Sequence, residues 1–178
     1  VMNRIQALEL FFENYHQYKE KVVFILVVVP SRNEVQKYWE RKEMIEQAVG
    51  KINGKYGSLT WTPVVFIYNS LPFDRLIGLY TVCDVMLVTP RRDGMNLVAK
   101  EFIASRKDKQ GVLILSEMAG AAKELTDAIL INPTDINEIA DAIKIALEMP
   151  SNEQASRIDN MQRRIAEYNV NRWSNNFI

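Results

Sequence analysis

Hydrophobic positions follow two spacings along the chain, one typical of helices and one typical of buried strands. Apolar side chains recur at helical spacing from Ile5 through Leu8 and Phe11 to Tyr15, which predicts a first helix. The unbroken apolar run at 22–29, most of it β-branched, predicts a parallel strand that is covered on both faces. The same order repeats afterwards, and we expect further strands at 64–68, 85–88, 112–115 and 128–131 and helices at 34–51, 74–81, 97–106 and 136–147.

This alternation of helix and strand predicts an α/β fold with a doubly wound, Rossmann-like parallel sheet. Ligands of such sheets bind outside the carboxyl ends of the strands. We expect one domain over 1–150, with terminal helices at 151–178 that pack on it or cross back from it.

Charge and composition exclude several classes of partner. The 178 residues include 22 basic and 22 acidic side chains, so the balance favours neither nucleic acid nor an anionic membrane surface as a partner. No apolar run approaches the roughly 20 residues needed to span a bilayer, and no signal peptide precedes the first helix, so we expect a cytoplasmic protein. With one cysteine, Cys83, and one histidine, His16, we expect no metal site, a buried inert thiol and no catalytic histidine.

A glycine turn joins the strand at 85–88 to the helix at 97–106. Gly94 lets a ligand approach the backbone closely, and the amides of Met95 to Ala99 at the helix start can then donate to a diphosphate. The carboxylate of Asp93 can accept hydrogen bonds from sugar hydroxyls, and Glu101 can reach a ribose. Judged from the spacing alone, an ordinary loop in which Asn96 caps the helix is as well supported as a turn that binds a ligand.

Two other strand ends carry weaker signals. Arg32 follows the strand at 22–29 and can clamp a phosphate, although residue type alone favours a solvated loop arginine. The segment 69–72 follows the strand at 64–68 and can present backbone groups to a base.

Four segments carry a resemblance to a known family. The run RDGMNLVAKE at 92–101, together with SEMAGAA at 116–122, VPSR at 29–32 and GKINGKYG at 50–57, resembles the trehalose-6-phosphate synthases. The resemblance implies a retaining glycosyltransferase with two facing Rossmann-like domains (a GT-B fold) that moves glucose from UDP-glucose to glucose 6-phosphate. It implies no cofactor, and this chain resembles the second half, the carboxyl-terminal domain that binds the donor.

The resemblance also implies roles for individual residues. Asp93 matches the carboxylate that contacts the donor glucose, which makes it a sugar-orienting residue and not a nucleophile. Leu71 matches a uracil contact and Arg32 an arginine that reaches the phosphate of the acceptor. The remaining matches bind the donor: Gly94, Met95 and Asn96 form the turn beneath the sugar and diphosphate, and Leu97, Val98, Ala99, Lys100 and Glu101 continue it, with Glu101 on the ribose.

Some parts of the family pattern are not in these 178 residues. The resembling proteins carry an amino-terminal domain with most acceptor contacts, and a first strand leading to an arginine and a lysine at the diphosphate. We therefore expect an expressed domain, or the ordered part of one, that binds UDP weakly and does not turn over alone. The full-length protein would meet glucose 6-phosphate through that missing domain, and whether it forms a homo-oligomer stays open.

Three other functions stay open at this stage. The same pocket suits a non-catalytic sugar-nucleotide-binding regulatory module of the same family. A glycogen or sucrose-phosphate synthase would share the fold, although those enzymes usually place a pair of glutamates around the donor turn. A Rossmann-like interaction domain without a donor site is the third alternative.

Overall fold

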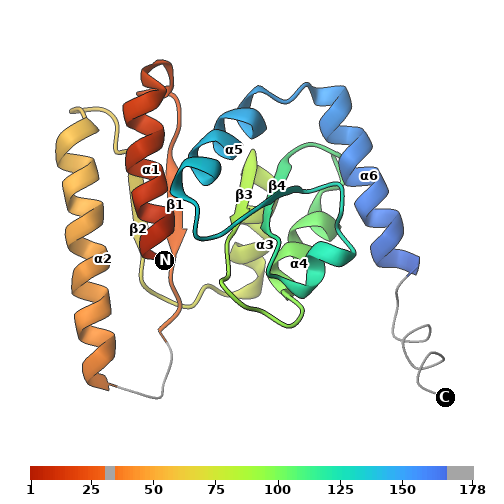
Figure 1. Cartoon of the computed structure of the whole chain (residues 1–178), viewed down its shortest axis with the longest axis horizontal. Helices are drawn as coiled ribbons and strands as arrows, with labels where there is room; N and C mark the ends of the chain where they lie inside the picture. The colour runs from red at the N-terminus through yellow and green to blue at the C-terminus, as the bar shows by residue number, and fades with distance from the viewer. Residues whose placement is uncertain (31–34, 168–178) are drawn as a thin grey trace. The chain divides into compact units, whose positions relative to one another are not determined.

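The chain folds into two compact units, Val1–Pro72 and Phe73–Ile178. The structure is a computed structural model that describes residues 1–30 and 35–167 (Figure 1).

The first unit holds a two-stranded parallel sheet. Its strands β1 and β2 run in register from Phe24 opposite Val64 to Val27 opposite Ile67. In chain order, the elements are α1 (Met2–Asn14), the 3-10 helix η1 (His16–Tyr18), β1 (Phe24–Val27), α2 (Val35–Tyr56) and β2 (Val64–Ile67).

Aromatic side chains fill the core of the first unit. The ring of Phe12 lies edge-on to Phe11, Phe24 and Trp61, with centroids 5.4–5.6 Å apart. Such edge-to-face pairs add to the energy gained from burial. The buried indole of Trp61 also donates to the carbonyl of Val22 at 3.1 Å, so its one polar group is satisfied.

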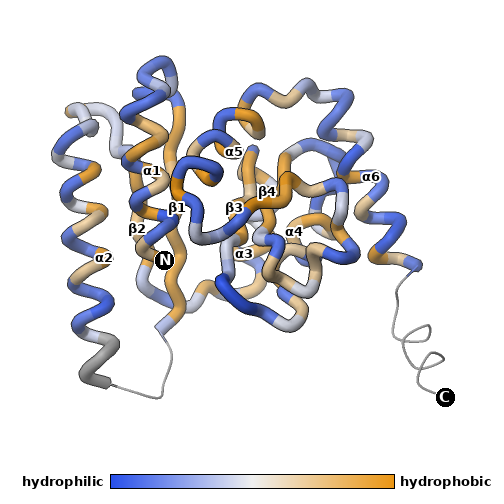
Figure 2. Tube along the Cα trace, in the orientation of Figure 1, coloured by the Kyte–Doolittle hydropathy of each residue, from blue (hydrophilic) through white to orange (hydrophobic). Residues whose placement is uncertain are grey.

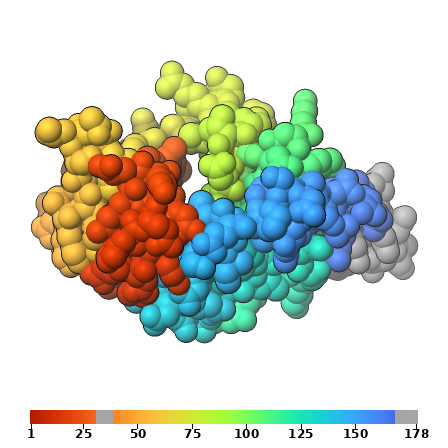
Figure 3. Space-filling view, turned by 90° about the horizontal axis from the view of Figure 1, so that it is seen from above, coloured from red at the N-terminus to blue at the C-terminus, as the bar shows by residue number. Residues whose placement is uncertain are grey.

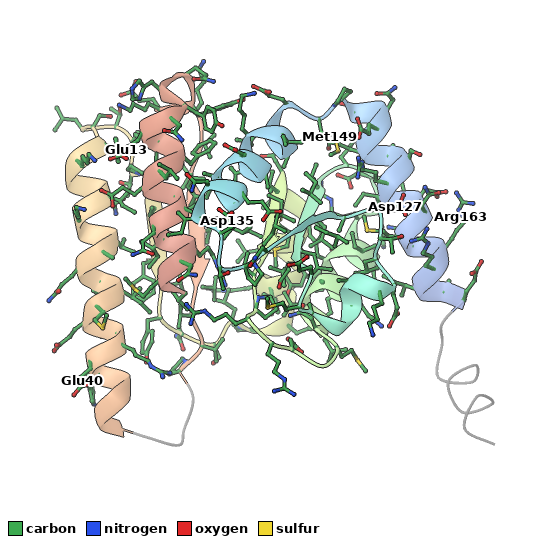
Figure 4. The ribbon with its side chains drawn as sticks, in the orientation of Figure 1. Glu13, Glu40, Asp127, Asp135, Met149 and Arg163 are labelled. Carbon is green, nitrogen blue, oxygen red and sulfur yellow. The ribbon has the colours of Figure 1, made fainter. Side chains whose placement is uncertain are left out.

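Helix α2 is longer than the sequence predicts. We expected it to end at 51, but it continues through Gly54 to Tyr56. The side chain of Asn53 explains the extension, because its amide donates to the carbonyl of Val64 and its oxygen accepts from the Val64 amide, both at 2.9 Å. At the outer face, Lys55 pairs with Glu13 at the end of α1 (Figure 4).

The second unit holds a three-stranded parallel sheet in the order β3-β4-β5. The middle strand, β4, is buried at all five positions, as the sequence predicts for a parallel strand with both faces covered. In chain order, the elements are α3 (Phe73–Val82), β3 (Val85–Val88), α4 (Leu97–Ser105), β4 (Val112–Ser116), the 3-10 helix η2 (Gly120–Lys123), β5 (Ile129–Ile131), α5 (Ile136–Glu148) and α6 (Ser151–Glu167).

Helices α3, α4 and α6 share one core with this sheet. Phe102 and Ile103 of α4 are fully buried beside Leu113 of β4, and α6 adds Ile158 and Met161. Figure 2 shows the pattern, with orange along β4 and mostly blue along α6, which contributes a narrow apolar stripe. Helix α6 therefore buries one face and leaves the other largely polar.

Polar contacts also join the elements of the second unit. Asp127, in the loop before β5, pairs with Arg164 of α6 at 3.3 Å and accepts from Asn160 at 3.2 Å (Figure 4). The guanidinium of Arg106 is buried and donates to the carbonyls of Tyr80 at 2.8 Å and Cys83 at 3.0 Å. These bonds satisfy carbonyls that the end of α3 leaves without helical partners.

The α/β class and the parallel pairing of the strands are confirmed. The strands form two hydrogen-bonded sheets, one in each unit, instead of the single sheet that we expected. Within the described residues, no helix is long and apolar enough to cross a membrane. The division into 1–150 and 151–178 stays a prediction, although α6 clearly packs into the core of the second unit.

Candidate functional site

The glycine turn lies between β3 and α4 and is organised by the side chain of Asp93. One carboxylate oxygen, Oδ1, accepts from the amides of Met95 at 3.1 Å and Asn96 at 3.2 Å. The other oxygen, Oδ2, accepts from the side-chain amide of Asn96 at 2.9 Å. These hydrogen bonds lower the pKa of Asp93 below its ordinary value, and the largest contribution comes from the side chain of Asn96. Asp93 is therefore an ionised acceptor at neutral pH.

Asn96 is the cap of helix α4. Its backbone is left-handed, with φ of 69°, and its Oδ1 accepts from the amide of Ala99 at 2.9 Å. A non-glycine residue in this region is uncommon and is often found at functional sites. The prediction that Asn96 caps the helix is thus confirmed.

The turn uses several of the amides that we expected to face a diphosphate. Met95 and Asn96 donate to Asp93, and Ala99 donates to Asn96, so these three amides already have acceptors within the turn. Their role at a diphosphate stays a prediction. The amides of Leu97 and Val98 are different, because no acceptor for them lies among the residues that the structure describes. Both residues are exposed. The first turn of α4 therefore presents two backbone donors to solvent.

A second segment, 117–121, follows β4, includes the start of η2 and holds the glycine turn in place; we call it the second loop. The amide of Gly120 donates to the carbonyl of Asp93 at 2.9 Å, and the amide of Ala121 donates to that of Met95 at 2.8 Å. A Cβ atom on Gly120 would lie 2.0 Å from the carbonyl oxygen of Gly94. The close approach of the two loops therefore requires glycine at position 120.

Gly120 was not among the predicted site residues. Its position could have been inferred from the sequence, because neighbouring parallel strands end at the same edge of a sheet. The strand at 112–115 leads directly into the small residues at 119–122, and these were positioned to meet the turn after the neighbouring strand.

The two charged residues of α4 point to different partners. Glu101 accepts from the hydroxyl of Tyr80 on α3, with 3.4 Å between the oxygens. Lys100 pairs instead with Glu124, with 2.7 Å between Nζ and Oε2, and both side chains are partly exposed. The ammonium group of Lys100 therefore contacts the residue that follows η2, whereas the carboxylate of Glu101 contacts α3.

Two predicted site residues belong to the first unit. Leu71 lies half-buried in the loop between β2 and α3 and belongs to the first unit, whereas the turn belongs to the second. Arg32 lies outside the described residues. Their roles at the site stay predictions.

The surroundings of His16 and Cys83 indicate structural roles for both side chains. His16 Nδ1 lies 3.0 Å from the carbonyl oxygen of Phe12. Cys83 is half-buried, and burial raises the pKa of its thiol, so the thiolate is disfavoured. In the part of the chain that the structure describes, no three His, Cys, Asp or Glu side chains are grouped closely enough to hold a metal ion.

Several apolar side chains are exposed at the turn. Met95, Leu97 and Val98 are exposed, and Met118 of the second loop is exposed as well. Figure 3 shows the yellow-green and green atoms of the chain from α3 to α4 at the surface. Backbone donors and a fixed carboxylate thus lie among exposed apolar side chains, a combination that suits a ligand with both polar and apolar parts.

Comparison with known proteins gives relatives over the whole chain. A bifunctional trehalose-6-phosphate synthase/phosphatase from Thermoproteus tenax is 50% identical over all 178 residues, which are 24% of its own length. The 56 kDa subunit of alpha,alpha-trehalose-phosphate synthase [UDP-forming] from Saccharomyces cerevisiae is 39% identical over the same residues, which are 36% of its length. The chain therefore spans between about a quarter and about a third of these curated relatives.

Solved structures show the same fold. A UDP-forming alpha,alpha-trehalose-phosphate synthase from Burkholderia xenovorans, in complex with glucose-6-phosphate, superposes on 98% of this chain and 38% of its own, with a TM-score of 0.93 and 38% identity. An E. coli structure with bound UDP-2-fluoro glucose covers 98% of this chain and 39% of its own, with a TM-score of 0.93 and 41% identity.

The family model for glycosyltransferase family 20 matches residues 1–178, the full length of the sequence. The chain belongs to glycosyltransferase family 20.

Proposed function

We propose that this chain is the carboxyl-terminal, donor-binding domain of a trehalose-6-phosphate synthase. The full enzyme would transfer glucose from UDP-glucose to glucose 6-phosphate with retention of configuration. The observation that carries the proposal is the glycine turn, where a helix starts with two amides that have no acceptor among the described residues, beside an ionised carboxylate. The relatives named above, which are trehalose-6-phosphate synthases, support the choice of substrates.

The diphosphate would bind at the start of α4. The amides of Leu97 and Val98 belong to the first turn of α4. Helix geometry leaves such amides without helical partners, and the helix dipole places partial positive charge there. Departure of UDP in the reaction builds negative charge on the diphosphate. Fixed amides at that position stabilise the transition state without having to reorganise.

The donor glucose would bind against Asp93. A carboxylate has about four acceptor positions, and three hydrogen bonds within the turn already fix this one in place. The remaining capacity is suited to a sugar hydroxyl. In this role Asp93 orients the sugar and forms no bond to it.

The ribose would bind Glu101, which lies about one turn into α4. Its carboxylate accepts from Tyr80 through Oε2, which leaves Oε1 for hydroxyl groups of a ligand. Leu71 at the uracil and Arg32 at the acceptor phosphate complete the proposed contacts. The cytoplasm is the proposed location, since the substrates are soluble phosphorylated metabolites.

We test donor binding by calorimetric titration of the chain with UDP and UDP-glucose. Glu101→Ala should weaken both ligands by about tenfold to hundredfold, because both contain the ribose and a hydrogen bond to a charged group is lost. Asp93→Ala should also weaken both, since the carboxylate holds the turn as well as the sugar. Glu43→Ala removes an exposed carboxylate from α2 and is the matched control, expected to bind like the wild type. Absence of saturable binding by the wild-type chain would contradict the proposal.

We further propose that the chain alone does not turn over. It spans 24% and 36% of two relatives, and most acceptor contacts are expected on the remaining part. Incubation with UDP-glucose and glucose 6-phosphate should therefore release no UDP above the uncatalysed rate. Sustained formation of trehalose 6-phosphate by the 178-residue chain would show that this expectation is wrong.

A further inference from the structure

The carboxylate of Glu101 has a buried neighbour on another helix. Tyr80 of α3 is 3% exposed, and its hydroxyl is 3.4 Å from Oε2 of Glu101. The ring lies edge-on to Phe102 of α4, with centroids 6.5 Å apart. Core packing therefore fixes the ring, while its hydroxyl reaches toward the site.

The hydroxyl of Tyr80 can act toward Glu101 as a donor. Burial, followed by the charge of Glu101, raises the pKa of Tyr80 to about 12. The phenol therefore keeps its proton at every pH at which the enzyme would work, and the carboxylate is its acceptor. The 3.4 Å separation is longer than the roughly 2.7–2.8 Å typical of such bonds, so the contact can shorten when a ligand orders the carboxylate.

We propose that Tyr80 is a positioning residue that aims the carboxylate of Glu101 at the ribose of the nucleotide. A glutamate side chain has three rotatable bonds, and an exposed one samples many rotamers. A donor fixed in the core holds Oε2 and leaves Oε1 toward the two ribose hydroxyls. This inference rests on the proposed function, and it adds a source of the selectivity for a ribonucleotide.

The substitution that isolates this role is Tyr80→Phe. It keeps the ring and its contact with Phe102 and removes only the hydroxyl. We measure affinity by calorimetry for UDP and for 2′,3′-dideoxy-UDP, which lacks both ribose hydroxyls. Tyr80→Phe should weaken UDP by about threefold to tenfold, the loss expected for one hydrogen bond, and leave dideoxy-UDP unchanged.

A double-mutant cycle tests whether Tyr80 acts through Glu101. In a Glu101→Ala background, Tyr80→Phe should cause no further loss of UDP affinity, because the group that it positions is gone. Tyr18→Phe, which removes a phenol hydroxyl in the first unit, is the matched control and should bind both ligands like the wild type.

The outcomes separate this inference from the proposed function. Equal weakening of both ligands by Tyr80→Phe would show a general structural effect and overturn the positioning role, as would no effect on either. If the wild type binds UDP and dideoxy-UDP equally well, the ribose contact of Glu101 fails and the inference fails with it, while donor binding survives. If Glu101→Ala abolishes the preference for UDP but Tyr80→Phe does not reduce it, the inference alone fails.

Discussion

Asn96 holds a left-handed backbone conformation and serves two partners at once. Its Oδ1 caps the amide of Ala99, and its Nδ2 donates to Asp93. An aspartate in the same place could still cap the helix but could no longer donate. The two functions of the side chain can therefore be separated by a single substitution.

We expect Asn96→Asp to weaken binding of UDP-glucose by about tenfold, because a second carboxylate then lies against Asp93 and repels it. Calorimetric titration measures the change. The control is Asn137→Asp, in the exposed first turn of α5, where an added negative charge suits the helix dipole. Unchanged binding by Asn96→Asp would contradict the pairing with Asp93.

The pKa of Asp93 makes a prediction about stability and pH. The pKa of Asp93 in the folded state lies below its ordinary value of 3.8, so the ionised form stabilises the turn. That contribution is complete above pH 3.8 and is lost as the pH falls through the lower, folded-state value. Thermal unfolding of the wild type and of Asp93→Asn should differ by a constant margin between about pH 7 and pH 5, and the margin should shrink in stronger acid. A margin that grows on acidification would contradict this account.

At the scale of elements, the contact between the two loops limits what position 120 can hold. We expect Gly120→Ala to lower the free energy of unfolding by about 1–3 kcal/mol, as overpacking does, and to weaken UDP binding because the glycine turn must shift. Chemical denaturation and calorimetry measure the two effects.

Gly54 provides the matched comparison for this substitution. It lies inside α2, and an added Cβ would meet no atom within 4 Å. Gly54→Ala should raise the free energy of unfolding by about 0.5–1 kcal/mol, since alanine favours the helix. Equal effects at positions 54 and 120 would argue that close packing of the loops is not the cause.

Elements with a strong local pattern were predicted well from the sequence. The run at 112–115 gave β4, and the amphipathic pattern after Asp135 gave α5, with Asp135 accepting from the amides of Asn137 and Glu138 as its cap. The end of α2 was not predicted, because it depends on the bonds between Asn53 and Val64, which are 11 positions apart.

The details of the site depend on contacts between distant residues, so only part of it could be predicted. The turn and the cap at Asn96 are encoded within a few positions of Gly94. The pairing of Lys100 with Glu124 joins residues 24 positions apart, and the contact of Tyr80 with Glu101 joins residues 21 apart. The sequence likewise does not predict which amides donate to Asp93, because that depends on the folded geometry of the turn.

At the scale of the whole chain, the two compact units should respond differently to a ligand. The proposed diphosphate and ribose contacts lie in Phe73–Ile178. UDP at 100 times its dissociation constant should stabilise the unit that binds it by about 2.7 kcal/mol. Amides of β4 that exchange by unfolding of the second unit should then exchange about a hundredfold more slowly.

Hydrogen exchange resolved by residue makes this measurement. The aromatic core around Phe12 in the first unit serves as the internal control, with exchange expected to change little. Protection confined to the first unit would place the nucleotide elsewhere and contradict the proposed site.

The hydrogen bonds of Asp93 have a kinetic consequence. Because the carboxylate already satisfies the amides of Met95 and Asn96, the turn has its folded shape before any ligand arrives. An incoming nucleotide then displaces water and binds to a preformed surface, so binding requires no slow isomerisation of the turn. In a rapid-mixing experiment, the observed rate should rise in proportion to the UDP concentration without reaching a plateau.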